Sequence, residues 1–178
     1  YERLLEGNTL EELLKEAEKE QKESGAYSQY IDWLEERDEE EAKRYWGEQL
    51  EGYENDSEIK PQGKPEPAKE QMRESFCRVN EETTAVLKRI AEENESTINT
   101  VAETAVGLLL QTYTGSRDVV FGKVVSGRNA DIAGIEDMVG LFINTIPVRV
   151  RAEKETTVSE LIRSQQKQGT ESSTYDYC

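Results

Sequence analysis

Residues 118–150 decide the fold, and they read DVVFGKVVSGRNADIAGIEDMVGLFINTIPVRV. Their first part, Asp118 to Val125, is a nearly continuous apolar run of strand-forming residues, as expected where both faces of a sheet are covered. Val139 to Val150 predicts a second, longer strand, and the loop between the two is rich in Gly, Asp and Asn. Because Pro147 cannot donate to a sheet ladder, the second strand either leaves the sheet there or lies at its edge.

Helices are predicted before and after these two strands in the sequence. Residues 97–112 are apolar on most faces and should form the most buried helix of the chain. Asn80 opens a helix before it, and a last helix starts at Thr157, where Glu160 completes a capping box. With one more strand predicted over residues 72–79, the pattern indicates an α/β fold in which helices pack on a mixed sheet.

The opening third of the chain is predicted to be all-helical, with apolar periodicity over residues 9–22, 27–34 and 42–50. A polar stretch follows, in which three prolines and a glycine favour extended chain. We therefore divide the chain into a helical segment (residues 1–52), a linker (residues 53–71) and a mixed α/β part (residues 72–178).

The charge of the chain narrows the range of partners. Its 38 acidic and 22 basic residues give a formal net charge of -16 over 178 residues. Phosphate backbones and anionic membrane surfaces are repelled by such a field, so we expect neither nucleic acid nor a membrane as a partner. The sequence also lacks the roughly 20 consecutive apolar residues of a membrane-spanning helix, so a cytoplasmic location is expected.

The sequence contains no histidine. Histidine is the commonest general base, the usual activator of a Ser or Cys nucleophile and the commonest metal ligand. Cys77 and Cys178 are the only cysteines, and their spacing offers neither a disulfide framework nor a metal motif. We therefore expect no metal site, and any enzymatic hypothesis must find its proton-handling group elsewhere.

The order of residues along 118–150 closely resembles the C-terminal lobe of condensation domains in non-ribosomal peptide synthetases. Those domains have a strand ending in a Ser-Gly-Arg turn, a glycine-containing loop, and a Gly-x-Phe-x-Asn-Thr strand ending in Pro and Arg. The likeness extends to YSQYIDWLEE (27–36), YWGEQLEG (45–52) and STYDYC (173–178). The matched residues are Ser126, Gly127, Arg128, Gly134, Glu136, Gly140, Phe142, Asn144, Thr145, Pro147 and Arg149.

The resemblance implies one chloramphenicol-acetyltransferase-like lobe of a V-shaped pair, with the reaction centre in a tunnel between the lobes. In the family, a His-His-x-x-x-Asp-Gly motif lies in the N-terminal lobe, shortly before the helix that Tyr1 joins. We therefore expect residues 1–52 to bridge from a missing N-terminal lobe, and residues 72–178 to be a C-terminal lobe that is incomplete at its end. On this view the chain holds no catalytic residue and is inactive alone.

The resemblance also implies two sets of site residues. Arg128 either pairs with Glu136 or Asp137 or faces the phosphate of a pantetheine arm. The loop over residues 129–139 either floors the tunnel or is a surface crossover, and the polar pair after Phe142 either holds neighbouring backbone or lines the channel. The tunnel set is Ser126, Gly127, Arg128, Phe142, Asn144 and Thr145, and the floor-loop set is Asn129, Gly134, Glu136 and Gly140.

The function implied is amide-bond formation between donor and acceptor substrates tethered to peptidyl or aminoacyl carrier proteins. Phosphopantetheine would be carried by those partners, with no cofactor bound by this chain, and an adenylation domain would be adjacent. Epimerising relatives of the same fold carry Gly-Trp-Phe-Thr-Ser where residues 140–145 read GLFINT, and ester-forming relatives match less closely. The other class is a non-catalytic module that binds carrier proteins, for which a basic patch of Arg149, Arg151, Arg163 and Lys167 would offset the acidic charge.

Overall fold

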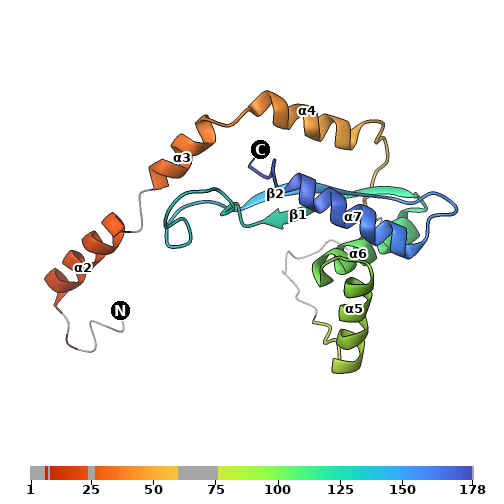
Figure 1. Ribbon diagram of the computed structural model, residues 1–178, viewed down its shortest axis with the longest axis horizontal. Helices are drawn as coiled ribbons and strands as arrows, with labels where there is room; N and C mark the ends of the chain where they lie inside the picture. The colour runs from red at the N-terminus through yellow and green to blue at the C-terminus, as the bar shows by residue number, and fades with distance from the viewer. Residues whose placement is uncertain (1–6, 8, 24–26, 60–75, 178) are drawn as a thin grey trace, which may run out of the picture. The chain divides into compact units, whose positions relative to one another are not determined.

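The computed structural model describes residues 7, 9–23, 27–59 and 76–177. These residues form helices and one two-stranded sheet, which confirms the predicted α/β class (Figure 1). In chain order the elements are α2 (Leu10–Glu23), α3 (Tyr27–Glu35), α4 (Glu39–Leu50), α5 (Glu81–Glu93), α6 (Ile98–Thr114), β1 (Asp118–Val125), β2 (Asn144–Arg151) and α7 (Val158–Ser172).

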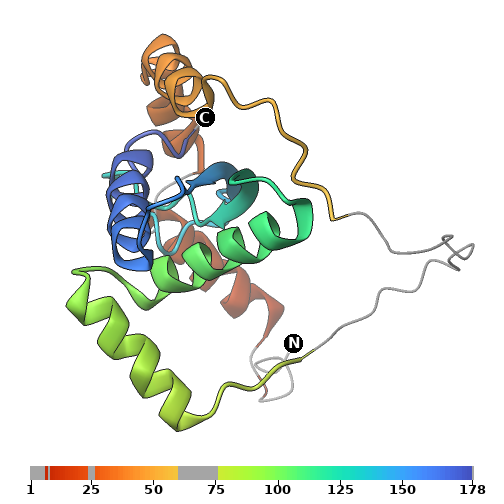
Figure 2. The same ribbon diagram turned by 90° about the vertical axis from the view of Figure 1, so that its right-hand side faces the viewer.

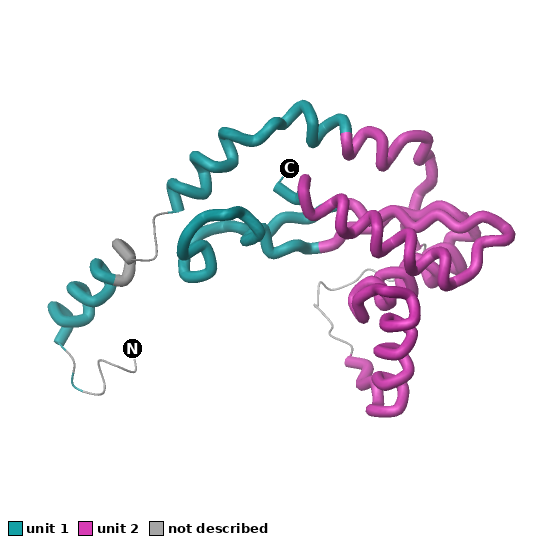
Figure 3. The backbone as a smooth tube through the Cα atoms, in the orientation of Figure 1, with its two compact units in different colours: residues 1–44, 124–146, 176–178 teal, residues 45–123, 147–175 magenta. Residues whose placement is uncertain are grey.

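The chain forms two compact units, which Figure 3 draws in different colours. Unit 1 comprises residues 1–44, 124–146 and 176–178, and unit 2 comprises residues 45–123 and 147–175. The division into helical segment, linker and lobe stays a prediction, because compactness alone does not test how a larger domain is divided.

Side chains cap the helices where the sequence places polar residues ahead of apolar periodicity. At the start of α7, Thr157 and Glu160 form the predicted capping box. The Asn80 side chain accepts a hydrogen bond from the Thr83 N–H at the start of α5, at 2.8 Å. At the end of α6, Gly115 takes a φ of 69°, a left-handed conformation that favours glycine. These local signals set the helix boundaries.

The two strands are antiparallel. The Ala152 N–H, just after β2, donates to the Arg117 carbonyl, just before β1, at 2.9 Å. This register sets Val120 opposite Arg149 and points the backbone groups of both residues away from the partner strand. Pro147 then also faces outward, so its missing N–H costs the ladder nothing and β2 continues through it.

Two predictions about strands were wrong. β1 has the predicted bounds, but β2 begins at Asn144, not at Val139. Residues 139–143 contact other segments through side chains and single hydrogen bonds, and they form no ladder. Residues 76–79 of the strand predicted over 72–79 form no strand either, and residues 72–75 lie outside the described residues.

The outer edges of the strand pair are hydrogen-bonded by side chains. On β1, the Ser57 Oγ accepts from the Val120 N–H at 2.9 Å, and the Asn55 amide donates to the Asp118 carbonyl at 3.3 Å. On β2, the Gln165 amide of α7 donates to the Arg149 carbonyl at 2.9 Å. These bonds satisfy backbone groups that a third strand would otherwise have to satisfy.

The core of unit 2 lies where α6 and α7 cover the strands, and α6 also contacts α5 (Figure 2). Val119, Val148, Val150 and Leu161 form one buried cluster, and Ile162 is buried in a second. α6 has four buried residues, as many as α7, but it is not covered on most of its faces. Because the helix packs along one face only, its other face stays in solvent, with Val106, Leu109 and Tyr113 exposed.

Arg149 ties three segments of unit 2 together. Its guanidinium donates to both carboxylate oxygens of Asp118, at 2.8 and 2.6 Å, and to the carbonyls of Gln49 and Glu51 near the end of α4, at 2.9 and 2.8 Å. This pairing raises the pKa of Arg149 above its usual range. A guanidinium that is turned inward cannot contribute to the basic patch proposed with Arg151.

Replacing Arg149 with alanine should lower the free energy of unfolding by about 3 kcal/mol, because it leaves the largely buried Asp118 carboxylate without its partner. Urea unfolding monitored by circular dichroism measures the loss. Arg151→Ala is the matched control, since Arg151 makes an exposed pair with Glu153, worth about 1 kcal/mol at most. Equal losses in the two variants would contradict the central role of Arg149.

Candidate functional site

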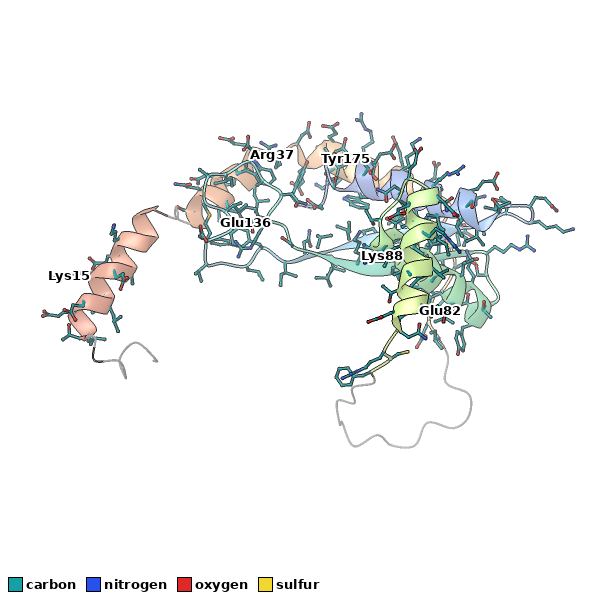
Figure 4. All side chains as sticks on the ribbon, turned by 60° about the horizontal axis from the view of Figure 1, so that its bottom comes forward. Lys15, Arg37, Glu82, Lys88, Glu136 and Tyr175 are labelled. Atoms are coloured by element: carbon teal, nitrogen blue, oxygen red, sulfur yellow. The ribbon has the colours of Figure 1, made fainter. Side chains whose placement is uncertain are left out.

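All of the sequence-predicted site residues lie in unit 1. They occupy the turn after β1, the loop that follows and the first two residues of β2. Glu136 marks the loop in Figure 4, where it is labelled. The segments are neighbours in the chain, so their grouping is local, but the structure shows which of their side chains face inward.

Gly127 lies directly against Phe142. It is buried and has a φ of 67°, and a Cβ built on it would overlap the carbonyl oxygen of Phe142. Beside it, the Ser126 Oγ accepts a hydrogen bond from the Arg128 N–H at 3.2 Å. The turn thus requires glycine both for its backbone conformation and for this close approach.

Arg128 organises the loop through backbone carbonyls. Its guanidinium donates to the carbonyl of Ile135 and, at 3.0 Å, to the carbonyl of Met138, and its Cζ lies 4.0 Å from the centroid of the Phe142 ring. Of the two alternatives for Arg128, the ion pair with Glu136 or Asp137 does not form: both carboxylates are exposed, because the loop curls its carbonyls toward the guanidinium. A planar guanidinium suits this role, since it can stack on a ring while donating in its own plane.

An aromatic cluster from α3 also packs against Phe142. The Phe142 ring is 3% exposed and lies 5.2 Å from the Tyr27 ring and 4.6 Å from the Tyr30 ring, between centroids. The Tyr27 hydroxyl donates to the Leu141 carbonyl at 2.7 Å, and a Cβ on Gly140 would overlap the Tyr27 ring. Tyr27 was missed from the sequence, although it opens the YSQYIDWLEE stretch.

The segment before β2 has two contrasting faces. Gly140 and Phe142 turn inward, whereas the apolar side chains that alternate with them face solvent. Those outward residues are Val139, Leu141 and Ile143, with 94%, 75% and 65% of their surface exposed. We call these three residues the apolar stripe. Grouped exposed apolar residues of this kind are unusual on the surface of a soluble protein, so this surface is a candidate for contact with a ligand or another polypeptide segment.

Asp176 connects the two ends of the loop. It is 6% exposed, and its Oδ2 accepts from the Asn129 amide at 2.7 Å. Its backbone carbonyl accepts from the Asn144 amide at 2.9 Å, and the Asn144 Oδ1 accepts from the Thr145 N–H at 2.8 Å. Asn144 therefore holds neighbouring backbone, while the Thr145 side chain is exposed. Asp176 was missed from the sequence, although it lies in the STYDYC stretch.

The described residues were also searched for metal sites and for membrane-spanning helices. Among them, no group of three or more His, Cys, Asp or Glu side chains is placed to hold a metal ion. No helix within the described ranges is long and apolar enough to cross a membrane.

Comparisons with known proteins match nearly the whole chain. The model of the family described as Condensation domain matches residues 7–178. Bacitracin synthase 3 of Bacillus licheniformis is 43% identical over 88% of this chain and 2% of its own length. Tyrocidine synthase 3 of Brevibacillus parabrevis is 44% identical over 85% of this chain and 2% of its own length. The chain thus spans only a few percent of these relatives.

A solved structure shares the fold. It is a holo four-domain nonribosomal peptide synthetase bound to AMP and glycine, and it matches with a TM-score of 0.54 at 22% identity. The match covers 57% of this chain and 8% of that one. At this level of identity the likeness concerns the arrangement of the backbone.

Replacing Gly127 with alanine should lower the free energy of unfolding by about 3 kcal/mol, because the change adds backbone strain to a clash with the Phe142 carbonyl. Gly52→Ala is the matched control: its φ is 68°, but nothing lies within 4 Å of the added Cβ. Strain alone should cost it about 1 kcal/mol. Thermal unfolding of both variants measures the difference, and similar losses would contradict the close approach.

Asp176 should make stability fall as pH rises. Burial raises the pKa of Asp176 above its ordinary value, so the folded chain holds this proton more tightly than the unfolded chain. The contribution of the protonated group is complete below about pH 4, the ordinary range of aspartate, and is lost as pH rises through the folded pKa.

Asp176→Asn removes this dependence while keeping an acceptor oxygen for Asn129. The free energy of unfolding of D176N, relative to the unsubstituted chain, should therefore increase from about pH 4 upward. Urea midpoints measured across this range check it, with D131N as the control for loss of one exposed charge. A difference between D176N and the unsubstituted chain that does not change with pH would contradict the prediction.

Proposed function

This chain belongs to the condensation-domain family, and from that premise we propose that it forms one wall of a site for amide-bond formation. The substrates would be a donor acyl group and an acceptor amine, each held on a carrier protein as a phosphopantetheine thioester. The partners in this proposal are the N-terminal lobe of the same domain, the peptidyl or aminoacyl carrier proteins and an adjacent adenylation domain.

The observation that carries the proposal is the two-sided segment before β2. Its inner side is fixed by the aromatic cluster and by Arg128, so its backbone has little freedom. Its outer side presents the apolar stripe, followed by the exposed Thr145. A rigid backbone with an apolar outer surface can orient the uncharged chain of a tethered substrate.

The residues of the tunnel set differ in burial and in hydrogen-bond partners. Gly127 and Phe142 are buried, Arg128 is engaged with carbonyls, and Asn144 bonds to backbone. We propose that these residues support the wall, and that Thr145 and the apolar stripe meet the substrate. The exposed Glu136 and Gly134 suit a floor loop that faces a solvent-filled channel.

The chemical step requires a group that this chain does not supply. The acceptor amine attacks the donor thioester carbonyl, a C–N bond forms, the C–S bond breaks, and the proton leaving the amine ends on the thiol. Moving that proton at neutral pH calls for a base such as histidine, and this sequence has none. We propose that the histidine motif of the N-terminal lobe provides it, while this chain contributes orientation.

The non-catalytic reading has less support. It relies on a basic patch to attract acidic carrier proteins, but Arg149 is turned inward to Asp118. Arg151 and Lys167 are each paired with a neighbouring carboxylate, at 3.2 and 3.8 Å. Each pair places a carboxylate beside the positive charge, which lowers the local positive potential that such docking needs.

The proposal predicts that the chain alone forms no amide, and that condensation requires the histidine-bearing lobe. The sharper test is Ile143→Asp in the complete domain, which places a charge on the apolar stripe. Because the substrate is then oriented less well, the condensation rate should fall about tenfold or more. A tenfold loss corresponds to a rise of about 1.4 kcal/mol in the activation free energy. Turnover of carrier-bound aminoacyl thioesters, followed by mass spectrometry, measures the rate.

Ile59→Asp is the matched control, because Ile59 is exposed to 48% and belongs to unit 2. It should leave the rate nearly unchanged. Condensation by the chain alone, or equal rates for the two variants, would overturn the proposed function.

A further inference from the structure

We infer that Asp176 is a positioning residue of this site, which holds the loop of residues 129–144 by both of its ends. The inference rests on the proposed function, since it assigns a role within the same site. Asp176 itself need not touch substrate, because it acts through Asn129 and Asn144.

The contacts of Asp176 reach the loop at its first and last residues. Its carboxylate accepts from the Asn129 amide at 2.7 Å, directly after Arg128. Its carbonyl accepts from the Asn144 amide at 2.9 Å, directly before Thr145. One residue from a distant part of the sequence thus joins both ends of the segment that contains the apolar stripe.

Joining the ends restricts the loop in a way that packing of its middle does not. The entropy of a flexible loop depends on the distance and direction between its ends, and fixing both removes most of its alternative conformations. Arg128 and the aromatic cluster hold the interior of the loop. Asp176 complements them by fixing where the loop enters and leaves.

Burying a carboxylate costs free energy, so filling space alone does not account for an aspartate at position 176. Asp176 is 6% exposed, and its charged form loses hydration on burial. An apolar side chain would avoid that loss, but it could not accept the Asn129 amide. The directional bond to Asn129 is therefore what an aspartate supplies at this position.

The first measurement is hydrogen–deuterium exchange in the full chain over residues 128–145. Asp176→Ala removes the acceptor and should speed exchange in this segment about tenfold, the factor expected for losing one charge-assisted hydrogen bond. Asp176→Asn keeps one acceptor oxygen and should restore most of the protection. Asp131→Ala, which removes an exposed charge from the same loop, is the matched control.

The second measurement is condensation by the complete domain. D176A should lower kcat about tenfold while KM for the acceptor thioester changes by about twofold or less, because orientation is lost and binding is kept. D176N should recover most of the rate. If D176A does not fold, Asn129→Ala removes the same bond from the other side and decides the question.

The two measurements distinguish a failure of the positioning role of Asp176 from a failure of the proposed function. Unchanged exchange in D176A, or exchange that rises equally over residues 98–114 of α6, would overturn the positioning role, as would a failure of D176N to restore protection. Absence of condensation by the unsubstituted complete domain would overturn the proposed function instead. The exchange result would then still decide whether Asp176 holds the loop.

Discussion

The burial of Phe142 is the constraint on which the rest of the site depends. Its ring packs against the Tyr27 and Tyr30 rings, and the Arg128 guanidinium lies over it. Because the neighbouring residues in an extended segment point the opposite way, an inward Phe142 forces Leu141 and Ile143 outward. The apolar stripe is thus a geometric consequence of one buried ring, and it remains exposed although its side chains are hydrophobic.

Polar side chains around Phe142 donate hydrogen bonds to backbone carbonyls. Arg128 donates to two loop carbonyls, and Tyr27 donates to the Leu141 carbonyl. The loop forms few backbone ladders of its own, so its carbonyls need side-chain donors. This explains how a segment without regular secondary structure can present a defined surface.

Features set by residues close together in the sequence were predictable, and features set by contacts between distant residues were not. The caps at Thr157 and Asn80, the stop at Gly115 and the bounds of β1 follow from signals that span a few residues. The start of β2 could not be predicted, because whether residues 139–143 pair with another strand depends on partners elsewhere. The exposure of α6 was missed for the same reason: apolar periodicity does not reveal how many faces are covered. The candidate site shows the same limit. The matched motifs identified segments that lie together in the structure, but they could not single out Tyr27 and Asp176, whose contacts join residues 114 and 47 positions apart.

The side chains along the strand edges have a consequence for how the protein behaves at high concentration. A short strand pair with open N–H and C=O groups is a template for strands of other molecules, and such pairing begins aggregation. Ser57 and Asn55 occupy those groups on β1, and Gln165 does so on β2. Side chains cannot propagate a sheet as a backbone can, so copies of this chain gain no ladder at these positions and sheet growth is blocked there.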